Sequence, residues 1–254
     1  MRALYVGASG MAAQQTKIDT VANNMANVGT TGFKKSTAAF EDLLYQEVTS
    51  GGKGETTNGA EVGGGVRLTS LDRDHSSGTF VETGDAFHVA IKGEEYLVLE
   101  GTDGTPAYTR DGTLALDGDG TLMTASGLRV AGKINIPRDV VSVTITEDGT
   151  VSGRFNGDVD ETVFGQLELA GFINPTGLRS LGGNTYAETP ASGQPQLGTP
   201  GESSQIVQGY LEASNVDVAE ELIQLILAQR AYELNSKVIQ AADESMSVAA
   251  NLRR

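Results

Sequence analysis

Two histidines, His75 and His88, are the side chains of this sequence best suited to proton transfer near neutral pH. His75 ends the run Asp72-Arg73-Asp74-His75, in which carboxylates stand beside an imidazole, as in a general base and the group that orients it. No second motif supplies a nucleophile or a metal partner, and the Gly-X-Ser-X-Gly pattern of hydrolase nucleophiles is absent. We therefore assign no catalytic residue and do not expect an enzyme.

The Asp-Gly pairs are the other feature that could do chemistry, as ligands for a cation. Residues 117–120 read Asp-Gly-Asp-Gly, as a calcium loop can begin, but the ligand spacing and the closing glutamate of such a loop are missing. Because Asp-Gly also favours tight turns between strands, a hairpin turn explains the pattern better. We assign no metal site and no cofactor. A calcium- or carbohydrate-binding extracellular β protein stays as an alternative, which these turns alone support.

The charge distribution separates the middle of the chain from its ends. The net charge is −15, and residues 46–210 hold ten basic and twenty-three acidic side chains, whereas residues 1–45 and 211–254 are nearer neutrality. A surplus of carboxylates argues against nucleic-acid binding, which depends on Lys and Arg neutralising phosphates, and against adhesion to anionic lipid. The acidic middle is best interpreted as a solvated surface.

Cysteine is absent, so the sequence offers neither disulfides nor thiol chemistry. The first residues lack the apolar core and cleavage site of a secretory signal, and no apolar run approaches the length of a transmembrane helix. Taken alone, these features favour a cytosolic protein or one that is exported unfolded.

The chain is organised around two terminal segments with heptad spacing. Near the N-terminus the spacing predicts a helix in residues 1–30 that ends near Asn27, where Asn, Gly and Thr favour a cap and a turn. Its seam alternates steps of four and three: Leu4, Ala8, Met11, Gln15, Ile18, Ala22 and Met25.

A second helix is predicted in residues 211–254. Apolar residues recur there every seven positions, at Val218, Leu225, Tyr232, Ile239 and Met246. Alanines fill the intervening seam at 228, 242 and 249, with Glu221 and Asn235 as polar members. Narrow seams of this kind suit packing against other helices, so we expect the two terminal helices to pair in a coiled-coil-like inner domain.

The middle of the chain is expected to be β-rich. Residues 31–65 are interpreted as a linker that includes a glycine-rich segment, Thr49–Gly65, with the composition of a flexible loop. Residues 66–210 alternate β-prone runs with turn signals, which predicts hairpins in a barrel- or sandwich-like domain. The fold class is therefore α+β. The clearest strands are 87–91, 96–99, 140–146 and 164–169, with Asp-Gly turns at 103, 111, 117 and 148.

The end of the first helix also carries a family resemblance. Residues 22–28 read Ala-Asn-Asn-Met-Ala-Asn-Val and are followed by Thr30, Gly32, Phe33 and Lys34. This run resembles the N-terminal signature of the bacterial flagellar rod and hook proteins. The continuation at 40–46, Phe-Glu-Asp-Leu-Leu-Tyr-Gln, is more similar to distal rod members of that family than to hook members.

The C-terminal part resembles the matching signature of the same family. Residues 208–217 read Gln-Gly-Tyr-Leu-Glu-Ala-Ser-Asn-Val-Asp, and Ala-Glu-Glu-Leu follows at 219–222. Residues 229–237, Gln-Arg-Ala-Tyr-Glu-Leu-Asn-Ser-Lys, extend the similarity. The resemblance thus covers both ends and, more loosely, the β-rich middle.

The resemblance implies a structural subunit of the distal rod of the flagellar basal body, which polymerises helically into a hollow drive shaft. A proximal rod or hook paralogue is the alternative within the family. Implied partners are further copies of the chain, proximal rod proteins, the hook protein, the surrounding periplasmic and outer-membrane ring proteins and the flagellar type III export apparatus. The implied location is the rod, spanning the periplasm, after export without a cleaved signal peptide.

The resemblance and the heptads together define an expected assembly interface. The asparagine amides at 23, 24 and 27 are expected to hydrogen-bond across packed helices. The glycine-rich segment corresponds to one associated with a straight, stiff rod. The interface residues are Leu4, Met11, Ile18, Asn23, Asn24, Met25, Asn27, Phe33, Asn215, Val218, Leu222, Leu225, Tyr232, Ile239 and Met246.

Overall fold

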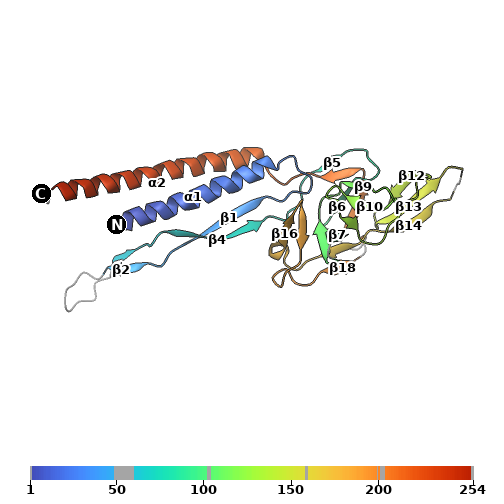
Figure 1. Ribbon diagram of the computed structural model, residues 1–254, viewed down its shortest axis with the longest axis horizontal. Helices are drawn as coiled ribbons and strands as arrows, with labels where there is room; N and C mark the ends of the chain where they lie inside the picture. Colours follow the sequence, from blue (N-terminus) through green and yellow to red (C-terminus); the bar gives the residue numbers. More distant parts are fainter. Residues whose placement is uncertain are drawn as a thin grey trace. The chain divides into compact units, whose positions relative to one another are not determined.

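The computed structural model describes residues 2–48, 60–101, 104–157, 160–198, 200 and 204–252. Within these residues the chain is α+β, with α1 (Arg2–Ala26) and α2 (Val218–Leu252) near its ends and strands between them (Figure 1). The residues divide into two compact units. Unit 1 comprises Met1–Ala26, Ser36–Arg73 and Asp217–Arg254, and unit 2 comprises Asn27–Lys35 and Asp74–Val216.

Unit 1 combines the two helices with a long β-hairpin. Strand β1 (Ser36–Asp42) pairs antiparallel with β4 (Val66–Arg73), with a register shift at Ala39/Phe40, and β2 (Gln46–Val48) pairs with β3 (Ala60–Val62). Both β1 and β4 pack on α1. The boundary expected between residues 65 and 66 is misplaced, because it would separate β1 from β4, the strand with which β1 pairs. Of the glycine-rich segment Thr49–Gly65, residues 49–59 lie outside the described residues.

Local chemistry explains where the helices begin and end. The Asp217 carboxylate accepts hydrogen bonds from the backbone N–H of Ala219 (2.8 Å) and Glu220 (3.2 Å), so it caps α2 as aspartate commonly does. Helix α1 ends at Ala26, and the N–H of Thr30 bonds the Asn27 carbonyl in the turn that follows. The expected end near Asn27 is confirmed.

Unit 2 is built from antiparallel sheets. Its largest sheet has nine strands, with β16-β17-β8-β7-β11-β10-β9 in order and β15 joining β7 to β18. A three-stranded sheet has the strand order β12-β13-β14, and two further sheets have two strands each, β19 with β6 and β20 with β5. The strands are β5 (Phe80–Glu82), β6 (Val89–Lys92), β7 (Tyr96–Glu100), β8 (Pro106–Thr109), β9 (Leu114–Leu116), β10 (Leu122–Thr124), β11 (Arg129–Val130), β12 (Val140–Ile145), β13 (Thr150–Phe155), β14 (Thr162–Gln166), β15 (Leu169–Gly171), β16 (Arg179–Gly182), β17 (Thr185–Ala187), β18 (Gln196–Gly198), β19 (Gln205–Gln208) and β20 (Tyr210–Glu212).

The β-rich expectation is confirmed, but the described strands form no closed barrel. The turns at Asp117-Gly118 and Asp148-Gly149 do join paired strands, β9 with β10 and β12 with β13. The turn expected at Asp111-Gly112 does not, because β8 and β9 are not partners. There Gly112 lets its own backbone lie against the backbone of Val89, since a Cβ on Gly112 would lie 1.6 Å from the Val89 carbonyl oxygen.

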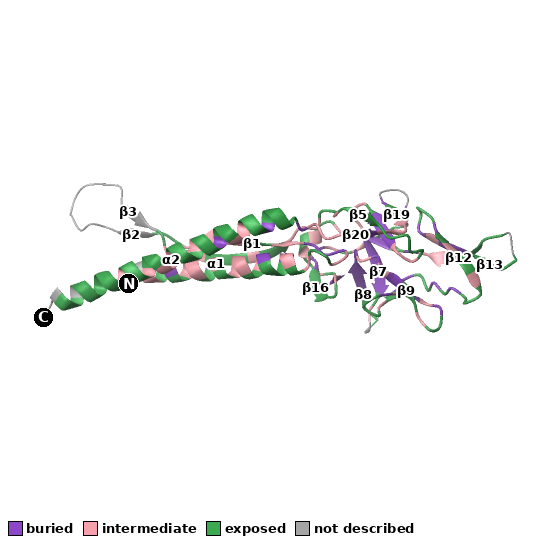
Figure 2. Cartoon of the chain, turned by 90° about the horizontal axis from the view of Figure 1, so that it is seen from above, coloured by how far each residue is buried: buried purple, intermediate pink, exposed green. Residues whose placement is uncertain are grey.

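The core of unit 2 consists of two clusters of buried apolar residues. Several strands contribute to them, and Figure 2 draws the buried stretches of the chain in purple. Predicted strands at 87–91, 96–99 and 140–146 correspond to β6, β7 and β12. The run 164–169 is divided between β14 and β15, because Leu167 leaves the ladder and its N–H bonds the Gly149 carbonyl at 2.8 Å.

Candidate assembly interface

The two terminal helices form an antiparallel pair in unit 1. Gly7 lies against Ile239 and Gly10 against Asn235 near one end, while Asn24 bonds Glu221 near the other. Helix α2 has 35 residues and α1 has 25. With Gly7 opposite Ile239, the start of α1 lies opposite roughly residue 244, so α2 continues for about 12 Å beyond it at 1.5 Å per residue. Figure 1 shows this extension of α2.

Glycines let the helices approach closely. A Cβ on Gly7 would lie 2.8 Å from Ile239 Cγ1, and one on Gly10 would lie 2.8 Å from Asn235 Nδ2. A glycine inside a helix costs about 1 kcal/mol relative to alanine, and close packing offsets that cost here. The Gly-X-X-Gly spacing was the sequence signal for this seam, and the heptad assignment, which began at Leu4, did not use it.

Polar groups are prominent among the buried residues of this pair. Asn24 is 2% exposed and Glu221 6% exposed. The Asn24 amide donates to the Ser36 carbonyl (2.9 Å) and to Glu221 Oε2 (3.2 Å), and its oxygen accepts from the Ser36 N–H (2.9 Å). One side chain therefore ties α1 to both β1 and α2. A hydrogen bond across helices, expected for Asn24, is confirmed within one chain.

The expected interface residues on the helices mostly flank this internal seam. Ile239 touches Gly7, and Leu225 is half-buried. On α1, the apolar members Leu4, Met11, Ile18 and Met25 are half-buried. Val218, Leu222, Tyr232 and Met246 are between 37% and 43% exposed. Of the seven-residue repeat, Ile239 thus lies against α1 of the same chain, whereas Val218, Tyr232 and Met246 are exposed beside the seam.

A second apolar face of α2, which the heptad assignment missed, points to solvent. Its large aliphatic residues are about half exposed or more, and Figure 2 shows α2 mostly in the colour of exposed residues. We call this set the outer α2 face; it comprises Ile223, Ile226, Leu227, Leu234, Val238 and Val248. Fully burying one such side chain contributes about 1.5–3 kcal/mol, so covering the face is strongly favourable.

The remaining expected residues lie at or near the ends of the helices. Asn23 is exposed in the last turn of α1, and Asn27 accepts a bond from the Thr30 hydroxyl at 3.2 Å. Phe33 is buried in unit 2. Asn215, also in unit 2, accepts from the Lys35 N–H (2.8 Å) and donates to the Asp74 carbonyl (2.9 Å). Phe33 and Asn215 are therefore structural residues of the β unit.

A buried charge cluster, which no sequence spacing indicated, lies beside Asn215 in unit 2. Glu212 bonds the Lys34 ammonium at 2.6 Å and Arg110 at 3.0 Å, and all three side chains are at most 1% exposed. Burial raises the pKa of the Glu212 carboxyl, but Arg110 and Lys34 outweigh that effect and leave its pKa below the usual range. Burial lowers the pKa of the Lys34 ammonium, which the Glu212 carboxylate only partly offsets.

His75 belongs to an aromatic cluster. Its Nδ1 lies 2.6 Å from the Tyr96 hydroxyl, and its ring meets Tyr96 and Tyr186 edge to face. His88 Nδ1 lies 2.8 Å from the Thr83 hydroxyl. Across the described ranges no group of three or more His, Cys, Asp or Glu side chains could hold a metal ion. Within the same ranges no helix is long and apolar enough to cross a membrane.

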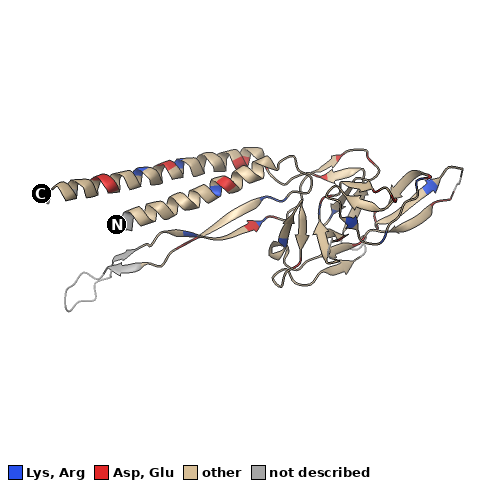
Figure 3. Ribbon diagram, in the orientation of Figure 1, with Lys and Arg blue, Asp and Glu red and all other residues tan. Residues whose placement is uncertain are grey.

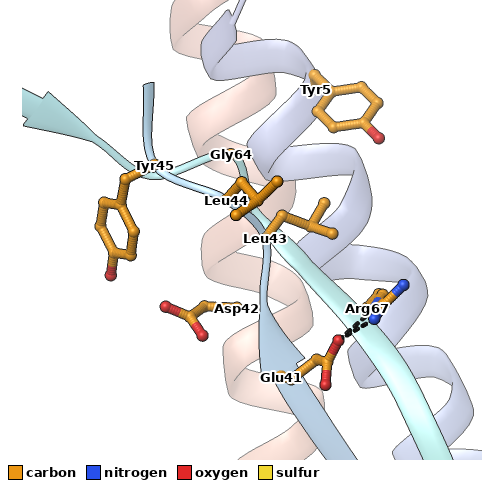
Figure 4. Close-up of a pocket in the computed structure, with 8 residues that line it drawn as sticks. All are labelled: Tyr5, Glu41, Asp42, Leu43, Leu44, Tyr45, Gly64 and Arg67. Atoms are coloured by element: carbon orange, nitrogen blue, oxygen red, sulfur yellow. Dashed lines mark hydrogen bonds and ion pairs between the residues drawn. The ribbon is translucent and has the colours of Figure 1, made fainter. Parts of the chain in front are cut away.

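An open hollow of about 700 Å³ lies in unit 1, near the start of α1 (Figure 4). We call it the Tyr5 hollow; it is lined by Tyr5, Glu41, Asp42, Leu43, Leu44, Tyr45, Gly64 and Arg67. Leu44 is 92% exposed, Tyr5 63% and Tyr45 57%. Glu41 and Arg67 form an ion pair there. The hollow is a second surface of unit 1 with exposed apolar side chains that the described residues leave uncovered.

Three family models match successive parts of the chain. One described as "Flagella basal body rod protein" matches residues 4–34, and one described as "Flagellar hook protein FlgE/F/G D1 domain" matches 90–153. A third, "Flagellar basal body rod FlgEFG protein C-terminal", matches 207–252. The first contains most of α1 and the third contains all of α2.

Curated relatives extend the match to nearly the whole chain. The flagellar basal-body rod protein FlgG of Agrobacterium fabrum is 44% identical over 98% of both chains. That of Borreliella burgdorferi is 43% identical over 100% of this chain and 99% of its own. The flagellar hook protein FlgE of Salmonella typhimurium is 44% identical, but over only 46% of this chain and 29% of its own.

Proposed function

The chain belongs to the flagellar basal-body rod protein family, and on this premise we propose that it is a structural subunit of the distal rod. Many copies stack helically into a hollow shaft that transmits torque from motor to hook. Rod relatives match along the full chain whereas the hook relative matches less than half, which favours a rod subunit over a hook paralogue.

The outer α2 face is the observation that carries this proposal. An apolar helical face of this length is unfavourable in water and suits burial against other helices. Contacts between unlike surfaces of successive copies generate an open helical filament when they do not close into a ring. In this proposal the terminal helices, expected in residues 1–30 and 211–254, form a coiled-coil-like inner layer together with the β1–β4 hairpin. The rest of the β-rich residues 66–210, from Asp74 on, form an outer layer.

The proposal includes partners and a location. The subunit contacts further copies of itself, proximal rod proteins below and the hook protein above, while ring proteins surround it. It passes through the flagellar type III export apparatus without a cleaved signal peptide and lies in the rod, across the periplasm.

Deletion of the gene in the source bacterium tests this function. We expect non-motile cells whose isolated basal bodies lack the distal rod and hook in electron micrographs, with both restored by a plasmid copy. Complete rods in the deletion strain would refute the proposal. Calorimetry with calcium and a glycan panel tests the alternative class of protein, and we expect neither to bind.

A further inference from the structure

The Tyr5 hollow and the outer α2 face are two uncovered apolar surfaces of the same unit. Figure 4 shows Tyr5 extending from α1 on one side of the hollow, with Leu43 and Leu44 on the chain segment between β1 and β2 that crosses in front of the helices. Leu44 is almost wholly exposed, which is costly for a leucine in a soluble chain. Both surfaces gain free energy when something apolar covers them.

A contact that builds a filament joins two unlike surfaces of successive copies. This requirement limits what can cover the Tyr5 hollow and the outer α2 face. If the outer α2 face met the same face of another copy, the contact would be symmetric and would close into a dimer. It must therefore meet a different apolar surface. In the described part of unit 1, the Tyr5 hollow is such a surface, with room for two aliphatic side chains.

Charge complementarity favours the same pairing. Lys237 lies between Leu234 and Val238 of the outer α2 face, and it is exposed. Asp42 is exposed at the hollow, where Glu41 already pairs with Arg67. Neither Lys237 nor Asp42 has an ion pair among the described residues. Figure 3 shows basic and acidic residues at intervals along α2, and of the two basic residues at 230 and 237, Arg230 is already paired with Glu233.

We propose that the Tyr5 hollow receives Leu234 and Val238 from α2 of a second copy of this chain, with Lys237 of that copy on Asp42. The inference rests on the proposed function and names the two surfaces that meet in the polymer. It gives each copy one hollow to fill and one face to insert, so the contact repeats from copy to copy without closing.

Cysteine cross-linking tests the pairing directly, because the native chain has no cysteine. The source bacterium produces two differently tagged full-length variants together, Leu44→Cys and Val238→Cys, and its basal bodies are isolated and mildly oxidised. We expect disulfide-linked dimers that carry both tags. The matched control replaces Val238→Cys by Val163→Cys. Val163 is a valine of unit 2 that is at least as exposed as Val238, and its variant should give about ten-fold fewer mixed dimers, as expected when no specific contact raises the local thiol concentration.

A charge exchange gives an independent measurement. Lys237→Glu and Asp42→Lys should each raise the concentration at which the purified chain polymerises by about ten-fold, which corresponds to roughly 1.4 kcal/mol per contact. The double variant should recover most of that loss, while the circular dichroism of all three monomers stays native.

The outcomes separate this inference from the proposed function. Rods that form with mixed dimers no more frequent than in the control, or with no recovery in the double variant, overturn the pairing and leave the rod function standing. If rods isolated from the source bacterium do not contain this protein at all, both the pairing and the proposed function are wrong.

Discussion

The two units of this chain differ in how much of their apolar surface they enclose. Unit 2 buries large apolar clusters, with Leu97, Leu99 and Val151 each at most 1% exposed, around a group of buried, paired charges. In unit 1 the helix seam buries Asn24 and Glu221, while Leu227 and Leu234 of α2 are more than half exposed. The β unit completes its core within one chain, whereas the helix pair does not.

This difference indicates where free energy is gained at each stage. Burial within unit 2 stabilises the monomer, and burial of the outer α2 face becomes available only when copies meet. A polar seam also weakens the pairing of α1 with α2, because buried polar groups contribute little net stability compared with apolar ones. Substitutions in the two units should therefore affect different measurements.

The largest expected effect is in unit 2, from Glu212→Ala. Removing this carboxylate leaves Lys34 and Arg110 buried without their partner, which should cost about 3–5 kcal/mol of unfolding free energy. Urea unfolding followed by the near-ultraviolet signal of the buried tyrosines measures this loss. Glu94→Ala, at an exposed position, is the control and should change stability by less than about 0.5 kcal/mol.

Acid should also destabilise unit 2, because it protonates the same carboxylate. The loss of unfolding free energy should be smaller than for Glu212→Ala, since a protonated Glu212 side chain still fills its site. Because the folded-state pKa of Glu212 lies below its usual value, its contribution is present above the unfolded pKa of about 4.3 and disappears as the pH falls through the folded pKa. Unfolding free energies measured across this window should fall less steeply for Glu212→Gln. Equal slopes for the two proteins would contradict the assignment.

The sequence predicted where α1 ends, but not where α2 begins or which groups partner the buried charges. The turn after Asn27 depends on near neighbours in sequence, so a local pattern sufficed there. The segment expected to be helical from residue 211 instead begins in β20, and α2 starts only at Val218. Lys34, Arg110 and Glu212 come together from distant parts of the chain, with no spacing that reveals them. Only the fold places them in one cluster.

The next prediction compares two leucines of α2 that lie on opposite sides of the helix. Leu225→Asp places a charge beside α1 and should cost about 3 kcal/mol of helix-pair stability, seen as an earlier loss of far-ultraviolet helicity. Leu227→Asp, on the outer face, should leave the monomer unchanged but abolish rods in electron micrographs. If both variants behaved alike, the distinction between inner seam and outer face would be wrong.

Heptad spacing alone could not make that distinction. A repeat shows that a helix has an apolar seam, but not whether the seam meets the same chain or another. In α2 apolar residues occupy more than one side, and the seven-residue series through Leu225 and Ile239 was the regular one. Gly7, which fits against Ile239, and Gly10, which fits against Asn235, identify the internal partner.

The smallest effect separates two adjacent asparagines at the end of α1. Asn24→Ala removes hydrogen bonds to Ser36 and Glu221 and should lower helix-pair stability by about 1–2 kcal/mol, since buried groups lose their partners. Asn23→Ala is the comparison variant. It makes the same change of helix propensity at an exposed position, where water can replace any hydrogen bond that the side chain loses. Thermal unfolding monitored by helicity measures both. If Asn24→Ala unfolded at the same temperature as Asn23→Ala, the buried amide would not be what fastens α1 to β1 and α2, and the close approach at the glycines would have to hold the pair alone.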